Sequence, residues 1–162
     1  MKDIEKKAQN LKKNHDEKII RKLSDMKDKF KDKEQVKKVL YKKDPIIYRV
    51  YRKEIDEKRN LSLTLMKPGK IGEEFFMTKG HRHDKPDKEI YVLVKGQGKL
   101  ILQNKQGKTK TISLKKGEEI KIPGDSAHRL VNIGDKTLEV LTIDNKETGR
   151  KYSVDFKKRV FS

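Results

Sequence analysis

The sequence predicts a mainly β protein, a sandwich or barrel of short strands that follows a helical N-terminal arm. Three observations support this fold class. Short segments rich in Val, Ile, Leu, Thr and Tyr recur after residue 44, turns with glycine or proline separate them, and no helical pattern intervenes. Many short strands without intervening helices are typical of sandwiches and barrels. We therefore expect a helical arm at 1–44 and a β-barrel domain at 45–162.

The strands of the predicted barrel are placed by their composition and by the turns between them. Gly96 and Gly98 surround one such turn, and Pro123 and Gly124 form another. The expected strands are residues 47–52, 61–66, 89–95, 99–103, 109–114, 119–122 and 138–143.

The first forty residues carry a helical pattern. Apolar side chains recur there at steps of three and four residues, and nearly all other positions are Lys, Asp or Glu. Ser24 followed by Asp25 could cap a second helix. Because the apolar stripe is narrow, we expect an exposed arm that packs along the barrel or a neighbouring subunit rather than a binding element. The stripe consists of Ile4, Ala8, Leu11, Ile19, Leu23, Met26 and Phe30.

The chain is strongly basic, with a formal net charge of +18. A basic surface favours nucleic-acid binding because it releases counterions from phosphates. However, the 43 basic residues include 35 lysines and only 8 arginines, and the excess is spread along the chain. Specific phosphate and base recognition favours the planar arginine fork. We therefore do not expect nucleic acid as the partner, and attraction of small anionic substrates explains the charge equally well.

The sequence also bears on cellular location. It contains no run of about 18 apolar residues that would suit a transmembrane helix, and its first residues lack the apolar region of a secretory signal. Cysteine is absent, which excludes disulfides and thiolate metal sites. We expect a cytoplasmic protein with no membrane partner.

Three of the four histidines fall within the predicted barrel and can be combined with one glutamate. His81 and His83 are two residues apart, so on a strand their side chains project from the same face. Glu89 opens the next strand and shares a face with Tyr91, and His128 follows a Pro-Gly turn. Three imidazoles and one carboxylate suit a divalent ion, and such a set can leave coordination positions open. We expect one ion per subunit, Fe²⁺ first, with Mn²⁺, Zn²⁺ or Ni²⁺ as alternatives.

These residues lie in motifs that resemble a known family. The run GHRHDKPDKEIYVLVKG (80–96) resembles the first cupin motif, and the run GEEIKIPGDSAHRLVN (117–132) resembles the second. The likeness is closer to the cupin-type glucose-6-phosphate isomerases of archaea. It includes RKLSDMK (21–27), PIIYRVYR (45–52), LTLMKPGKIGEEFFMTKGH (63–81) and IPGDSAHRLVNIGDKTLEVLTI (122–143), and covers about residues 20–155. The resemblance implies a cupin barrel.

The resemblance also implies an activity and its residues. That family interconverts glucose 6-phosphate and fructose 6-phosphate in glycolysis and gluconeogenesis, usually as a homodimer with a divalent metal. It implies that His81, His83, Glu89 and His128 are the metal ligands, and that Glu89 and Tyr91 act beside the reacting carbons C1 and C2.

A second group of residues is implied for the phosphate end of the substrate. By the same resemblance, Thr64, Thr78 and Gly80 hold the phosphate group, together with Tyr48 or Tyr51. Hydroxyls and backbone N–H groups are suited to this task, because binding energy from the remote phosphate can orient the reacting end.

The C-terminal part departs from the family pattern. In the run IDNKETGRKYS (143–153), Gly149 and Tyr152 match, but Asp144 and Arg150 stand where the family has tyrosine and histidine at the sugar. Tyr152 stays a candidate substrate contact, and Arg150 either holds an anionic group or is a surface residue. Two alternatives therefore stay open: a non-catalytic cupin that senses a phosphosugar, and a cupin that acts on another small anion, such as an iron enzyme oxidising an acid with O₂.

The positive charge yields a first testable prediction. If it gathers an anionic substrate, kcat/KM should fall as salt rises while kcat stays constant, because screening weakens long-range attraction. Steady-state kinetics across a salt series measures both constants. A kcat/KM that does not change with salt would show that the positive charge does not attract the substrate.

Overall fold

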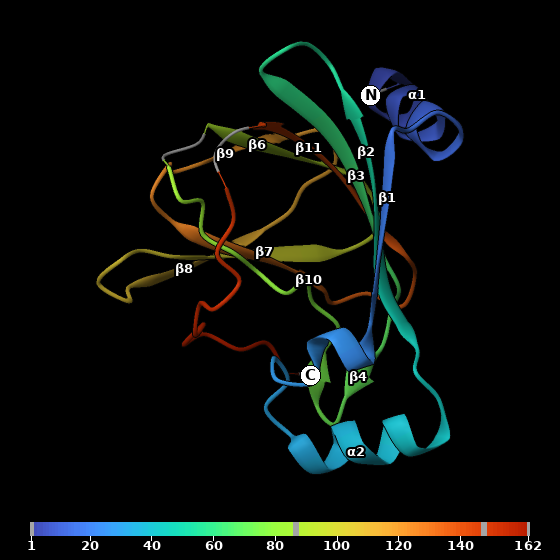
Figure 1. Cartoon of the computed structure of the whole chain (residues 1–162), viewed down its shortest axis with the longest axis vertical. Coiled ribbons are helices and arrows are strands. Elements are labelled where there is room, and N and C mark those ends of the chain that lie inside the picture. The colour runs from blue at the N-terminus through green and yellow to red at the C-terminus, as the bar shows by residue number, and fades with distance from the viewer. Residues whose placement is uncertain (1, 86–87, 147–148, 162) are drawn as a thin grey trace.

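The computed structural model describes residues 2–85, 88–146 and 149–161 (Figure 1). Its helical elements are α1 (Lys2–Lys13), the 3₁₀ helix η1 (Leu23–Met26) and α2 (Lys33–Lys42). Its strands are β1 (Glu17–Lys22), β2 (Ile46–Glu54), β3 (Arg59–Met66), β4 (Lys70–Ile71), β5 (Glu74–Phe75), β6 (Glu89–Lys95), β7 (Gly98–Gln103), β8 (Thr109–Ser113), β9 (Glu119–Ile122), β10 (Ala127–Asn132) and β11 (Leu138–Asn145).

The strands form two main sheets that enclose the core. The larger has the order β1-β2-β3-β11-β6-β9 and the smaller the order β10-β7-β8, and β4 and β5 form a separate pair. Every pairing between these strands is antiparallel. Figure 1 shows β7 and β10 side by side, to the left of β1, β2 and β3 of the larger sheet. The predicted β-barrel architecture is therefore confirmed, and the seven expected strands all occur within two residues of their predicted ends.

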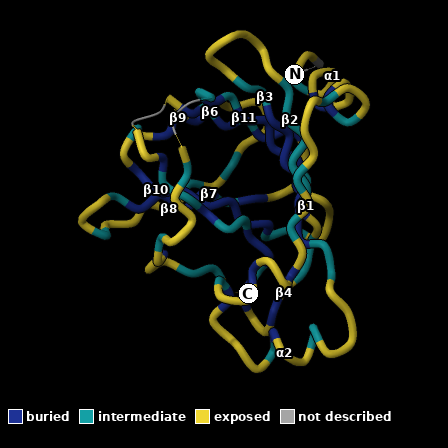
Figure 2. The backbone as a smooth tube through the Cα atoms, in the orientation of Figure 1, coloured by how far each residue is buried: buried dark blue, intermediate teal, exposed yellow. Residues whose placement is uncertain are grey.

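Alternation along the strands decides which side chains enter the barrel. In β6, Tyr91 and Leu93 are buried in the main core, which also contains Leu100 and Leu130 from the smaller sheet. Val92 and Val94, which alternate with them, pack on the outer face of the larger sheet instead. Successive side chains of a strand point to opposite faces, so this pattern is what the sequence predicts. In Figure 2 strands β7 and β10 are largely dark blue, whereas α1 and the turns are largely exposed.

Helix α1 covers the outer face of the larger sheet. Its Ala8 and Leu11 are 2% and 1% exposed and pack against Leu63, Val94 and Leu141. Its polar side also contacts the sheet, since Lys12 forms a 2.6 Å ion pair with Glu139. The predicted packing of an N-terminal helix along the barrel is therefore confirmed.

The helical prediction is wrong for residues 17–22. They form strand β1, which pairs with β2 at the edge of the larger sheet. Within these six residues only Ile19 and Arg21 are partly buried, a period of two that the longer three- and four-residue spacing hid. The division of the chain into 1–44 and 45–162 stays a prediction, and the pairing of β1 with β2 crosses it.

The helix capping prediction also needs correction. Ser24 and Asp25 lie within η1, and the later helix α2 begins after Asp32. The Asp32 carboxylate accepts a 3.1 Å hydrogen bond from the Gln35 backbone N–H, which is the usual role of an N-cap residue.

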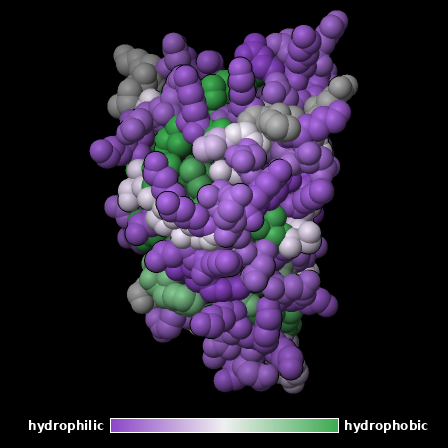
Figure 3. All heavy atoms as spheres, turned by 90° about the vertical axis from the view of Figure 1, so that its left-hand side faces the viewer, coloured by the Kyte–Doolittle hydropathy of each residue, from purple (hydrophilic) through white to green (hydrophobic). Residues whose placement is uncertain are grey.

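The surface is mostly hydrophilic. Figure 3 shows the face that carries β8, where apolar patches are separated by hydrophilic side chains. Among the described residues, none of the helices combines the length and apolar character needed to cross a membrane.

The packing of α1 yields a second prediction. We expect Leu11→Ala to lower the free energy of unfolding by about 2–4 kcal/mol, because it leaves a cavity between the helix and the sheet. As the control, Gln9→Ala replaces an exposed residue of the same helix and should change stability little. Urea unfolding measures both variants. Equal stability of the two would mean that α1 does not pack on the sheet in solution.

Candidate metal centre

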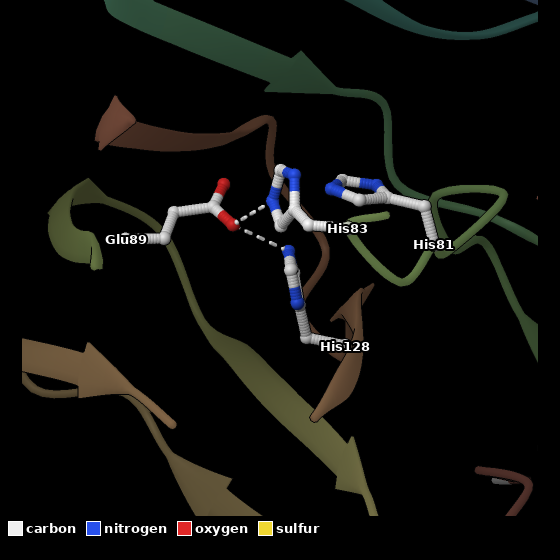
Figure 4. Close-up of side chains that lie close together, drawn as sticks. All are labelled: His81, His83, Glu89 and His128. Atoms are coloured by element: carbon white, nitrogen blue, oxygen red, sulfur yellow. Dashed lines mark hydrogen bonds and ion pairs between the residues drawn. The ribbon is translucent and has the colours of Figure 1, made fainter. Parts of the chain in front are cut away.

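Four side chains from two walls of the barrel meet at one point (Figure 4). His81 and His83 lie in the extended segment before β6, Glu89 is the first residue of β6, and His128 lies in β10. The backbones of His81 and His128 exchange two hydrogen bonds of 3.1 and 3.0 Å. This pairing fixes the segment with the first two histidines against the strand that carries the third.

The four residues have the geometry of a metal site. Their ligand atoms lie within 4.8 Å of one another. The Oε2 atom of Glu89 is 2.8 Å from Nε2 of His83 and 2.7 Å from Nε2 of His128. His83, Glu89 and His128 are 7%, 3% and 1% exposed, so little water reaches them.

Hydrogen bonds on the far side of two rings orient them toward this centre. The Nδ1 atom of His83 lies 2.9 Å from the Gly149 carbonyl, and that of His128 lies 3.4 Å from the Ser126 carbonyl. A carbonyl only accepts, so these contacts favour protons on Nδ1 and lone pairs on Nε2. The same arrangement orients histidine ligands in metal sites.

The electrostatics of the group also fit a bound cation. Burial, followed by the nearby His128, lowers the pKa of His81 to about 2, so its imidazole is neutral. Burial alone would raise the pKa of Glu89, but His128 and the other imidazoles hold it well below its usual range. The buried Nε2 atom of His81 makes no hydrogen bond. Such buried polar atoms are costly unless something satisfies them.

A bound cation would remove the repulsion within this group of side chains. Neutral imidazole lone pairs that face a carboxylate oxygen repel it, whereas a divalent ion between them attracts all four donors. The mixed N/O donor set suits Fe, Mn, Zn or Ni. The residues present therefore fit a divalent metal ion.

One cavity contains three of these donors together with most of the other predicted site residues. His81, Glu89 and His128 line it from one end. The sequence-predicted residues that also line it are Tyr48, Thr64, Thr78, Gly80, Tyr91, Arg150 and Tyr152.

The structure does not bring Tyr51 to this cavity. Its ring stacks on His15 at 4.5 Å between centroids, on the face of the sheet that α1 covers. Tyr48 and Tyr51 are three residues apart on β2, so they point to opposite faces. Alternation along the strand therefore selects Tyr48 for the cavity.

Tyr91 lies deep in the cavity beside the donor group. It is 6% exposed, and its ring meets that of His128 edge to face at 5.5 Å. Burial, with the carboxylates of Glu89 and Asp144, raises the pKa of Tyr91 well above its ordinary value. Its hydroxyl therefore stays protonated and can donate a hydrogen bond.

The segment before His81 is held in place by a buried arginine. Arg129 donates hydrogen bonds of 3.0 and 2.8 Å to the carbonyls of Thr78 and Lys79. Gly80 has a φ of +74°, and a Cβ there would lie 2.4 Å from the Phe156 ring. A side chain at this position would be strained and would clash, so glycine is needed for this close approach.

Asp144 and Arg150 form an ion pair in the cavity wall. Asp144 Oδ2 is 2.7 Å from Arg150 Nη2, and the Asp144 side chain is 2% exposed. The two residues that depart from the family pattern therefore contact each other in the fold. Arg150 is not a free surface residue.

Four further polar side chains that the sequence reasoning missed also line the cavity. They are Arg21, Arg52, Ser62 and Thr142. Alternation along the strand expected at 47–52 could have found Arg52, because it lies on the same face of β2 as Tyr48. Arg21 pairs opposite Tyr48, and it was missed because residues 17–22 were expected to be helical.

Solved structures with a similar fold are cupin enzymes. An oxalate decarboxylase from Lactobacillus farciminis in complex with formate has a TM-score of 0.55 at 22% identity, covering 65% of this chain and 31% of that chain. An oxalate oxidase with glycolate has a TM-score of 0.50 at 17% identity, covering 59% and 46%. At such identity the likeness establishes the fold alone. Fold and donor set together define a cupin with a site for a divalent metal ion.

Sequence comparison gives the family. A model of the glucose-6-phosphate isomerase family matches residues 20–160. The glucose-6-phosphate isomerase of Pyrococcus abyssi is 42% identical over 139 residues, which cover 83% of this chain and 74% of the relative. That of Thermococcus kodakarensis is 41% identical over 149 residues, covering 90% and 78%. The chain therefore belongs to the glucose-6-phosphate isomerase family.

The donor group yields a third prediction. A hundredfold excess of Mn²⁺ over its Kd should raise Tm by about 5–10 °C, because the ion binds the folded state. The His128→Ala variant should lose this shift, and His15→Ala, which removes the histidine outside the centre, should keep it. Thermal melts with and without metal measure the shift. A shift that His128→Ala retains would place the metal elsewhere.

Proposed function

We propose that this protein interconverts glucose 6-phosphate and fructose 6-phosphate, with a divalent metal ion held by His81, His83, Glu89 and His128. One observation carries the proposal: the donor group and a set of hydroxyl side chains line the same cavity, in a member of the glucose-6-phosphate isomerase family. The ion would polarise the oxygens on C1 and C2 as a Lewis acid.

The reaction moves one hydrogen between two carbons. In the open-chain sugar, the hydrogen on C2 of the aldose passes to C1, and the proton on O2 passes to O1. We assign the first transfer to the Glu89 carboxylate, which would accept the proton from C2 and return it at C1. Tyr91 would assist at the oxygens, because its hydroxyl stays protonated beside Glu89. The reverse reaction follows the same path backwards.

Hydroxyl groups would hold the phosphate. The Thr78 Oγ1 atom accepts the Leu130 backbone N–H at 3.0 Å, and the Tyr48 hydroxyl accepts that of Lys79 at 3.2 Å. A hydroxyl that already accepts a hydrogen bond still has its own proton to donate. Both are therefore prepared as donors, and we assign the Thr64 hydroxyl and the Gly80 backbone N–H to phosphate binding as well.

The opposite wall would contact the sugar. Tyr152 lies against His81, with 5.8 Å between ring centroids. Arg150 is fixed by Asp144, so its guanidinium can donate to sugar oxygens in one orientation. We therefore assign Arg150 and Tyr152 to substrate binding.

Finer features of the proposal follow the resemblance. We propose Fe²⁺ as the metal, a homodimer as the assembly and the cytoplasm as the location, with the reaction serving glycolysis or gluconeogenesis. The donor set supports several divalent ions equally.

A second candidate is a non-catalytic cupin that senses a phosphosugar. The buried Asp144–Arg150 pair favours it, because a charged pair replaces two family side chains at the sugar. Such a protein would bind the same ligand and leave it unchanged.

The fourth prediction is turnover itself. Protein stripped with chelator and reloaded with Fe²⁺, Mn²⁺, Zn²⁺ or Ni²⁺ should convert fructose 6-phosphate to glucose 6-phosphate in a coupled assay. Glu89→Gln should lower kcat by about 10²–10⁴-fold, because it removes the proposed base.

Two controls make this assay decisive. The His128→Ala variant should lack metal-restored turnover, and His15→Ala should retain it. Tight binding of fructose 6-phosphate without turnover under any metal would favour the sensor and contradict the isomerase.

A further inference from the structure

Strand β1 brings an arginine into the cavity from the far end. Arg21 pairs opposite Tyr48 across the β1–β2 ladder, and residues directly opposite each other lie on the same face of a sheet. Both line the cavity that contains His81, Glu89 and His128. Three strands, β2, β3 and β11, lie between β1 and β6, which carries Glu89. Arg21 therefore lines the same cavity as the metal donors from a strand well removed from theirs.

A tyrosine ring connects this end to the metal centre. The Arg21 guanidinium lies 5.9 Å from the centroid of the Tyr152 ring, and the Lys79 ammonium lies 5.6 Å from the same centroid. The Tyr152 ring meets His81 edge to face. Lys29 donates a hydrogen bond to the Tyr152 carbonyl. Three cations thus gather around one residue at the rim of the cavity.

Asp28 and Asp155 act on Lys29, whereas the other two cations form no ion pair among the described residues. In the described part of the chain, no ion pair joins Arg21 or Lys79 to a carboxylate. The carboxylates that line the cavity have other partners, since Glu89 contacts imidazoles and Asp144 pairs with Arg150. A concentration of cations beside a concave site attracts an anion.

One ligand can reach both the metal donors and the hydroxyl of Thr78. Thr78 precedes His81 by only three residues, the chain turns between them at Gly80, where φ is +74°, and all three residues line the same cavity. A ligand with C1 and C2 at the metal centre would therefore bring its phosphate near Thr78, Lys79 and Arg21.

We propose that Arg21 and Lys79 bind the phosphate of the substrate as a pair of cations, together with the hydroxyls of Tyr48 and Thr78. This inference rests on the proposed phosphosugar function and adds charge recognition, which hydroxyls alone do not supply. A dianion gains most from charge-assisted hydrogen bonds to a guanidinium. Strand β1 is then part of the binding site.

The test compares two arginines on neighbouring strands. Arg21→Gln removes the proposed contact. Arg49→Gln makes the same change in net charge on β2, but Arg49 pairs opposite Ile20, which is 39% exposed on the other face. The full chain, loaded with Mn²⁺, is titrated with fructose 6-phosphate, inorganic phosphate and uncharged fructose by calorimetry.

We expect Arg21→Gln to weaken binding of fructose 6-phosphate by about 10–100-fold, the usual effect of losing a charged hydrogen bond. The Arg49→Gln variant should bind within about twofold of the parent. Fructose binding should not change in either variant. In the activity assay, KM should rise with kcat nearly unchanged, because the contact is the same in ground and transition states.

Two further variants guard against misfolding. Lys79→Gln tests the second cation in a different segment, and Arg21→Lys should recover part of the affinity because it restores a charge. The inference would be overturned if the Arg21→Gln and Lys79→Gln variants both bound fructose 6-phosphate as tightly as the Arg49→Gln variant does.

The outcomes also separate this inference from the proposed function. Normal turnover with unimpaired binding by the Arg21 and Lys79 variants would reject the cation pair and leave the isomerase in place. Phosphosugar binding that depends on Arg21, without turnover, would support the pair and reject the isomerase. A parent protein that binds neither fructose 6-phosphate nor phosphate would reject both.

Discussion

The arrangement of four donors around one buried point is the constraint on which the site depends. Glu89 Oε2 lies within 2.8 Å of two imidazole nitrogens, and the rings of His83 and His128 are held by carbonyls on their far sides. Without a cation, this set places lone pairs against a carboxylate in a region of little water. The barrel supplies the rigidity, because the backbone of His81 is paired with that of His128 on strand β10.

The same construction organises the rest of the cavity. Just before the segment that carries His81 and His83, Arg129 donates hydrogen bonds to the carbonyls of Thr78 and Lys79. Gly80 allows this segment to pass close to the Phe156 ring. Metal ligands and proposed phosphate contacts therefore lie on one short, rigid run of chain, which holds the two ends of a ligand at a fixed separation.

Much of this could be predicted from the sequence, for physical reasons that differ between elements. Burial in β6 alternates from Glu89 to Leu93, so the shared face of Glu89 and Tyr91 followed from spacing alone. Strand β1 could not be predicted in the same way, because EKIIRK owes its extended form to pairing with β2. Tyr51 was expected at the phosphate site by resemblance, although it lies three residues from Tyr48 on the same strand and therefore points to the outer face. The Asp144–Arg150 contact joins two different segments and becomes visible only in the fold.

The most direct test of the metal centre is anomalous diffraction from a crystal of the full chain loaded with Zn²⁺. The account predicts one strong peak among His81, His83, Glu89 and His128, with metal–ligand distances of about 2.0–2.2 Å. A peak elsewhere, or four side chains that contact one another with no metal between them even at saturating Zn²⁺, would contradict it.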